Sequence, residues 1–101
     1  MIAIALLRRK GFRFEFDRLS GTLQIFGANG RLRRQISLRE IQSIVIEQST
    51  LEGEVVGRIV FVMQSGDRLP LMRTYSSGLP GKQLVAEAIR EFLKLPPVEM
   101  D

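Results

Sequence analysis

The apolar residues of this 101-residue chain change their spacing once, and that change limits the fold more than any other feature. From Phe12 to Asp17 aromatic and charged residues alternate, which is the period of a half-buried β-strand. After Pro80 the apolar residues recur at helical spacing until Pro96-Pro97. The sequence therefore predicts a mainly β (α+β) protein that ends in one amphipathic helix.

Turn-forming residues divide the β region into short strands. Asn29-Gly30 is a turn pair, and Pro70 restricts the last strand to a sheet edge or to a position without a ladder hydrogen bond. Leu32 and Ile36 are predicted to face the core, and Arg34 falls on the same side. The expected strands are residues 12–17, 22–26, 31–38, 41–48, 55–64 and 68–73, with residues 49–54 as an exposed hairpin loop. A seventh strand at the start of the chain would complete a barrel or sandwich.

The helical segment has one apolar face and one charged face. The residues predicted to pack on the sheet are Leu84, Val85, Ala88, Ile89 and Phe92. The residues predicted to face solvent are Lys82, Glu87, Arg90, Glu91 and Lys94. We expect Val98–Asp101 to be a short tail.

The first seven residues, Met1 to Leu7, are all apolar, and Arg8-Arg9-Lys10 follows at once. Seven residues are too few to cross a bilayer, and a signal peptide would carry its positive charges before the apolar run. The segment is therefore either a first strand or the end of a transmembrane helix with a cytoplasmic-side basic flank. We accordingly divide the chain into residues 1–11 and a single domain over residues 12–101.

Composition argues against an enzyme. The chain contains no cysteine and no histidine, which excludes a thiol nucleophile and the usual acid–base group near neutral pH. Gly81-Lys82 at the helix start lacks the flanking residues of a phosphate-binding loop, because Ser76 and Gln83 occupy the required positions. Acidic pairs such as Glu15 and Asp17 are typical of a solvated strand face. We expect no catalytic residue, no metal and no cofactor.

Charge is distributed unevenly along the chain, whose formal net charge is +4. Residues 1–39 carry a balance of +7 and residues 40–101 a balance of −3. This asymmetry indicates an acidic partner or an anionic membrane surface, unless it only keeps the protein soluble. Nucleic acid is not expected, because only Phe26 and Tyr75 remain for base stacking. The candidate binding residues are Arg8, Arg9, Lys10, Arg31, Arg33 and Arg34.

A meander of about seven antiparallel strands capped by a C-terminal helix resembles the pleckstrin-homology-like superfold, whose members bind lipids, peptides or proteins. Lipid-binding members carry several basic residues around the first hairpin. With the first hairpin placed at Asp17–Gly21, only Arg18 is available. Phosphoinositide recognition is therefore not expected from the sequence.

Four segments together resemble the soluble domain of the photosystem I assembly protein family first named as chloroplast hypothetical open reading frame four. They are Phe16–Arg18, Glu40–Glu47, Leu69–Thr74 and Phe92–Pro96. The resemblance implies a non-catalytic scaffold at the cytoplasmic or stromal face of a thylakoid membrane, with photosystem I subunits as partners and this chain soluble by itself. Family members carry two transmembrane helices before this domain, which Met1–Leu7 could continue. The alternative is a generic bacterial pleckstrin-homology-like domain that binds lipid headgroups or a peptide.

Overall fold

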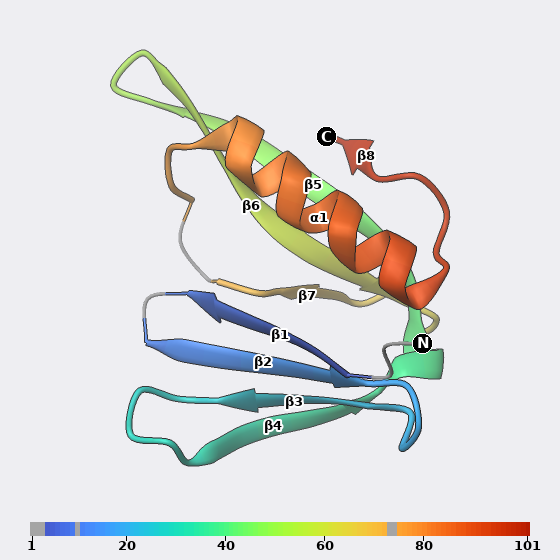
Figure 1. Ribbon diagram of the computed structural model, residues 1–101. Helices are drawn as coiled ribbons and strands as arrows, with labels where there is room; N and C mark the ends of the chain where they lie inside the picture. The colour runs from blue at the N-terminus through green and yellow to red at the C-terminus, as the bar shows by residue number, and fades with distance from the viewer. Residues whose placement is uncertain (1–3, 10, 73–74) are drawn as a thin grey trace. The chain divides into compact units, whose positions relative to one another are not determined.

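The computed structural model describes residues 4–9, 11–72 and 75–101, which divide between two compact units, Met1–Glu40 and Ile41–Asp101 (Figure 1). Each unit contains one four-stranded sheet, and a single α-helix lies in the second. The described residues thus form eight strands instead of the expected seven, and one strand pair is parallel. The mainly β class with one helix near the end of the chain is confirmed.

The first unit is an antiparallel meander in the order β1-β2-β3-β4. Its strands are β1 (Ile4–Arg9), β2 (Phe12–Asp17), β3 (Thr22–Phe26) and β4 (Leu32–Ser37), followed by a short 3-10 helix at Leu38–Glu40. β1 pairs with β2 over its whole length, from Ile4 opposite Asp17 to Arg9 opposite Phe12. Of the two predictions for the first segment, the strand is confirmed for residues 4–7, and Met1–Ala3 lie outside the described residues.

One face of this sheet carries the buried side chains of the unit. Phe16, Leu23 and Ile36 are register partners across β2, β3 and β4 and are all buried, as is Phe14. Leu32 was predicted on this face, but it is 49% exposed. A bulge between Ile25 and Phe26 gives β4 one extra residue, which places Leu32 opposite Phe26 on the other face.

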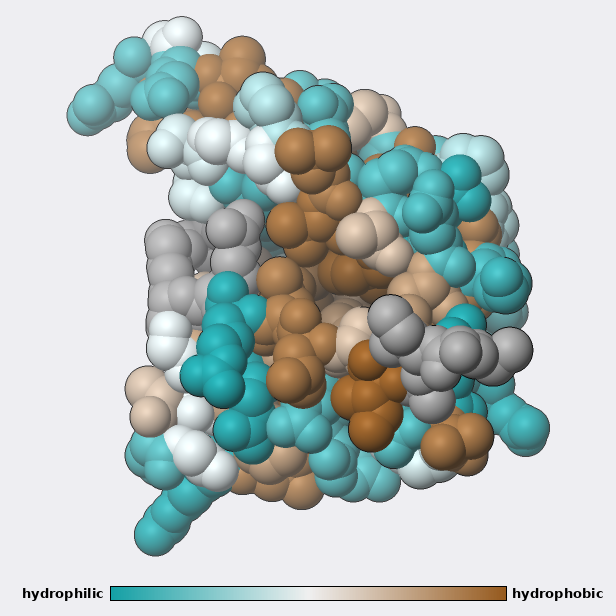
Figure 2. All heavy atoms as spheres, in the orientation of Figure 1, coloured by the Kyte–Doolittle hydropathy of each residue, from teal (hydrophilic) through white to brown (hydrophobic). Residues whose placement is uncertain are grey.

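The second unit has the strand order β7-β6-β5-β8. Its elements are β5 (Ile41–Leu51), β6 (Glu54–Met63), β7 (Arg68–Pro70), α1 (Leu79–Leu93) and β8 (Glu99–Met100). β7 is an edge strand, which is one of the two arrangements expected from Pro70. The β5–β6 hairpin is the projection at the upper left of Figure 2, where hydrophobic and hydrophilic atoms lie side by side; Leu51 and Val55 there are 61% and 50% exposed.

α1 lies across β5 and β6 (Figure 1). A Cβ on Gly57 would come within 2.8 Å of Leu79 Cδ1, so α1 covers the sheet face that Gly57 shares with Ile59 and Phe61. Val60 points to the opposite face, yet Val60 and Phe61 are both fully buried. The prediction that the centre of this strand is buried from both sides is therefore confirmed.

The buried face of α1 differs from the predicted one. Its buried residues are Lys82, Ala86 and Ile89, whereas Leu84 is 74% exposed. Lys82 was predicted to face solvent, but its Nζ donates to the backbone oxygens of Ser76 and Ser77, which join β7 to the helix. Because these carbonyls satisfy the ammonium group, the methylene chain of Lys82 can be buried. The helix is therefore rotated relative to the orientation that would bury only apolar residues.

The segment after α1 was expected to be an unpaired tail. Lys94 ends the helix in the left-handed conformation, with φ of 59°. Beyond the two prolines, Glu99–Met100 forms β8, which pairs parallel to β5 with Glu99 opposite Val45 and Met100 opposite Ile46. Within the residues that the structure describes, no helix combines the length and the hydropathy needed to span a bilayer.

Candidate functional site

Two turns of the first unit meet at one end of its sheet. The β1–β2 turn contains Gly11, and the β3–β4 turn spans residues 27–31. Gly11 has a φ of +81°, and a Cβ placed on it would lie 3.2 Å from the Cβ of Ala28. The positive φ favours glycine at position 11, and the second turn leaves little room for a side chain there.

A polar hollow of about 310 Å³ lies at this meeting point. Its lining residues are Arg8, Gly11, Phe12, Arg13, Phe26, Gly27, Ala28 and Gly30. Arg8, Arg13 and Phe26 are register partners on three neighbouring strands, so their side chains share one face of the sheet. The guanidinium carbon of Arg13 lies 4.2 Å from the centre of the Phe26 ring. Stacking on an aromatic ring holds a guanidinium in place while leaving its edge open.

The carboxylate of Glu15 offsets part of this positive charge. Arg13 Nε lies 2.7 Å from Glu15 Oε2, an ion pair without an aligned hydrogen bond. Both side chains are about one-third exposed. Arg8 faces Arg13 across β1 and β2 and is exposed. The hollow therefore combines one partly neutralised arginine with one exposed arginine.

The structure separates the predicted binding residues. Arg8 lines the hollow, Arg31 belongs to the β3–β4 turn, and the Arg33 side chain lies within 3.4 Å of a Cβ placed on Gly27. Arg34 is opposite Ile25, on the sheet face that carries Phe14, and so does not face the hollow. Lys10 and the side chain of Arg9 lie outside the described residues.

Sequence reasoning missed Arg13 and Phe26 as parts of this site. The alternation around Phe12 already placed Arg13 on the outer face, but only the strand register brings it beside Arg8. The structure also corrects the position of the first hairpin. That hairpin is β1–β2, whose turn follows Arg8 and Arg9, and Asp17–Gly21 is the second turn. The argument against lipid headgroup binding rested on the wrong turn.

The hollow brings guanidinium groups and an aromatic ring together. Guanidinium groups bind phosphate and carboxylate oxygens through paired hydrogen bonds, and exposed cations gain affinity near an anionic surface. Among the described residues, no group of three or more acidic side chains is placed to hold a metal ion. The side chains at the two turns are therefore of a kind that can bind an anion.

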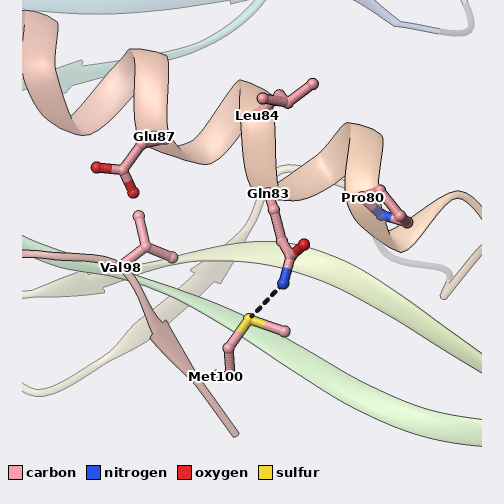
Figure 3. A pocket seen from close by; sticks show the side chains of 6 residues that line it. All are labelled: Pro80, Gln83, Leu84, Glu87, Val98 and Met100. Carbon is pink, nitrogen blue, oxygen red and sulfur yellow. Dashed lines mark hydrogen bonds between the residues drawn. The ribbon is translucent and has the colours of Figure 1, made fainter.

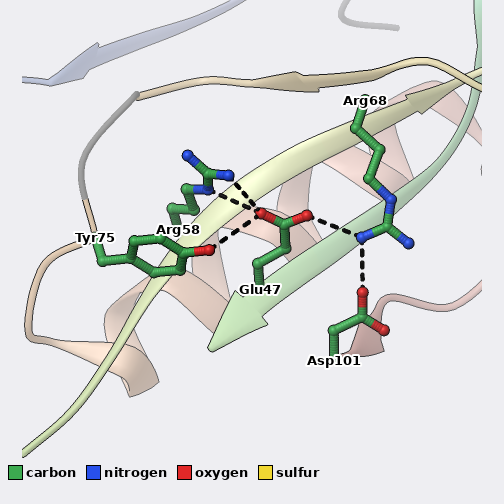
Figure 4. Close-up of polar contacts among 5 residues, drawn as sticks. All are labelled: Glu47, Arg58, Arg68, Tyr75 and Asp101. Atoms are coloured by element: carbon green, nitrogen blue, oxygen red, sulfur yellow. Dashed lines mark hydrogen bonds and ion pairs between the residues drawn. The ribbon is translucent and has the colours of Figure 1, made fainter. Parts of the chain in front are cut away.

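A second polar cluster belongs to the second unit (Figure 4). Glu47 of β5 accepts hydrogen bonds from Arg58 Nε at 2.8 Å and Arg68 Nη1 at 2.9 Å. The hydroxyl of Tyr75 lies 3.5 Å from the same carboxylate, and the guanidinium carbon of Arg58 lies 4.6 Å from the Tyr75 ring centre. Arg68 Nη1 also donates to Asp101 Oδ2 at 2.7 Å. Glu47 thus ties β5 to β6, to β7 and to the loop before α1.

These contacts shift two pKa values. The hydrogen bond from Arg68 holds the pKa of Glu47 below its ordinary value of 4.5, with Arg58 adding to the effect and burial opposing it. The hydrogen bond to Asp101, followed by that to Glu47, raises the pKa of Arg68. Glu47 is therefore ionised throughout the neutral range, and its side chain is only 16% exposed.

We expect Glu47→Gln to lower the free energy of unfolding by about 1.5 to 3 kcal/mol at pH 7, because it weakens two charge-assisted hydrogen bonds. Since the folded pKa of Glu47 is lowered, its ionic contribution is present above about pH 4.5 and is lost as pH falls through the folded pKa. Urea unfolding at pH 7 and pH 3 measures this. A stability difference between the two proteins that stays constant over this range would contradict the assignment.

No protein-family model matches the chain, and no curated protein sequence is significantly similar to it.

Proposed function

We propose that this chain is a non-catalytic module that works beside a membrane and docks on anionic surfaces through the two turns of its first unit. The observation that carries the proposal is the convergence of these turns, with Arg8, Arg13, Arg31 and Arg33 at one end of one sheet. Each basic side chain near an anionic bilayer contributes about 1 kcal/mol. Ile4 and Leu6 are 51% and 59% exposed and share the β1 face with Arg8, which suits contact with a lipid surface.

The same proposal includes a pleckstrin-homology-like fold. Support comes from the succession of a four-stranded meander, a three-stranded antiparallel group and then one helix. In lipid-binding members of that superfold the basic residues surround the first hairpin, and Arg8 and Arg9 flank the first hairpin of this chain.

For the partner, the resemblance to the photosystem I assembly family suggests subunits of a photosynthetic membrane complex, reached from its cytoplasmic or stromal side. The two most specific segments of that resemblance fall in one unit: Ile41–Ile44 opens β5, and Pro70 ends β7. A scaffold would then use its first unit for the membrane and its second unit for protein contacts.

The experiment compares vesicles and membrane proteins as partners. We expect the chain to sediment with vesicles that contain phosphatidylglycerol and to stay in the supernatant when the vesicles are neutral. Bound chain should be released as salt rises from about 0.05 M to about 0.5 M.

Pull-down from solubilised photosynthetic membranes tests the partner, and recovery of photosystem I subunits supports it. Selective binding to one phosphorylated lipid with no recovered protein would favour a headgroup-specific module. Failure to bind anionic vesicles at low salt would overturn membrane docking.

A further inference from the structure

The segment Val98–Asp101, here called the tail segment, occupies the open edge of β5. Asp101 N donates to Ile46 O at 2.9 Å, and Gln48 N donates to Asp101 O at 3.3 Å. The strand it forms contains only two residues, whereas β5 runs on to Leu51. The tail segment thus pairs with part of a longer edge, on the side of β5 away from β6.

The alternate side chains of the tail segment meet α1. Val98 and Met100 line a groove of about 540 Å³ together with Pro80, Gln83, Leu84 and Glu87 of the helix (Figure 3). Gln83 reaches from α1 to Met100, where its Nε2 lies 3.7 Å from the sulfur. A thioether is a weak acceptor, and Met100 remains 41% exposed, so the groove is incompletely filled.

The acidic end of the tail segment meets Arg68. Arg68 Nη1 donates to Asp101 at 2.7 Å, and both side chains are nearly half exposed. The same nitrogen donates to Glu47, which Arg58 also holds. Arg68 is therefore positioned by Glu47 whether or not Asp101 is present, and departure of Asp101 would not leave it unpaired (Figure 4). Asp101 directly follows Met100 of β8, so its side chain points to the opposite face of the sheet from the groove, and Arg68 is a carboxylate-binding point on that face.

We infer that the edge of β5 beside α1 is a docking site for an extended peptide segment of a partner protein, and that the tail segment, which now occupies this edge, is its intramolecular competitor. The tail segment indicates the chemistry of the partner segment: apolar side chains at alternate positions toward α1, and a carboxylate on the other face for Arg68. A strand that pairs along β5 as far as Leu51 would form more backbone hydrogen bonds than the tail segment does. This inference concerns the second unit only and does not depend on membrane docking by the first.

The test uses a dye-labelled peptide with the sequence of residues 95–101. Fluorescence anisotropy compares the unaltered chain with the full-length variant Val98→Ser/Met100→Ser/Asp101→Ser, whose own tail segment has lost its side-chain contacts with α1 and Arg68. We expect the variant to bind the peptide at least about tenfold more tightly, because a tethered competitor acts at an effective concentration on the order of millimolar. A control peptide with the same three serine replacements should not bind.

A further substitution and an exchange measurement locate the site. Arg68→Gln, added to the triple variant, should weaken peptide binding about tenfold. Hydrogen exchange of the Gln48 amide, which faces the tail segment, should accelerate in the triple variant. The Glu47 amide points to β6 and should keep its protection, which shows that the fold is intact.

Two results would overturn the inference. One is absence of peptide binding to a triple variant whose Glu47 amide stays protected, because the tail segment would then be only a structural strand. The other is a dimer of the unaltered chain, detected by sedimentation and lost in the triple variant, because the occupant would then be the tail segment of a second copy.

Discussion

Replacing Phe61 by alanine should lower the free energy of unfolding by about 3 to 5 kcal/mol, the usual cost of removing a fully buried phenylalanine. Phe61 lies in the centre of β6, opposite Ile44 on β5 and Leu69 on β7, and has no exposed surface. It shares the sheet face that α1 covers, so its loss leaves a cavity between sheet and helix. Because small domains are stable by about 5 to 15 kcal/mol, a large share of the folded margin would be lost.

Urea unfolding followed by circular dichroism measures this change, and Leu84→Ala is the matched control. Leu84 is apolar and lies on α1 but is 74% exposed, so its truncation should change stability by less than about 0.5 kcal/mol. Phe92→Ala, which the helical pattern alone would rank as equally severe, should fall between them because Phe92 is only half-buried. Equal effects of Phe61→Ala and Leu84→Ala would mean that α1 does not cover this sheet.

The strands could be predicted from sequence where one face of the strand is buried and the other is exposed to solvent. The alternation over Phe12–Asp17 sets strand and face together, and Phe14 and Phe16 are buried as expected. Alternation fails at Leu32, because a bulge adds one residue without any signal in the local pattern. A single inserted residue moves a side chain to the opposite face of the sheet.

The helix illustrates a different limit. Its existence follows from the spacing of apolar residues, but its rotation depends on carbonyl groups outside the helix. From its sequence position Lys82 is expected at the surface. It is buried because the backbone oxygens of Ser76 and Ser77 accept hydrogen bonds from its ammonium group. Likewise, the pairing of Glu99 and Met100 with β5 involves too few residues to show a period.

The candidate site could be predicted only in part, because the grouping of its residues depends on strand register. Charge counting located the excess of positive charge in the first 39 positions. The grouping of the basic residues required the strand register, which places Arg8 beside Arg13 and leaves Arg34 on the opposite face. The ambiguity of Met1–Leu7 also hid the first hairpin, and with it the position of Arg8 and Arg9 beside that hairpin.

The second large effect concerns membrane affinity, which should depend on where charges are removed and not only on how many. Arg8→Gln/Arg33→Gln removes two cations beside the β1–β2 and β3–β4 turns, here called the paired turns. Arg18→Gln/Arg39→Gln removes two from the other end of the same sheet, near the β2–β3 turn and the 3-10 helix. Both variants carry a net charge of +2, two less than the unaltered chain. Bulk electrostatic attraction is therefore matched, and only the position of the charge differs.

The most direct test of membrane docking is the dissociation constant of these two variants and the unaltered chain for phosphatidylglycerol-containing vesicles at low salt. At about 1 kcal/mol for each cation, Arg8→Gln/Arg33→Gln should bind about thirtyfold more weakly, and Arg18→Gln/Arg39→Gln should stay within about threefold of the unaltered chain. Equal losses in the two variants, or no loss in either, would contradict the claim that the paired turns form the docking surface.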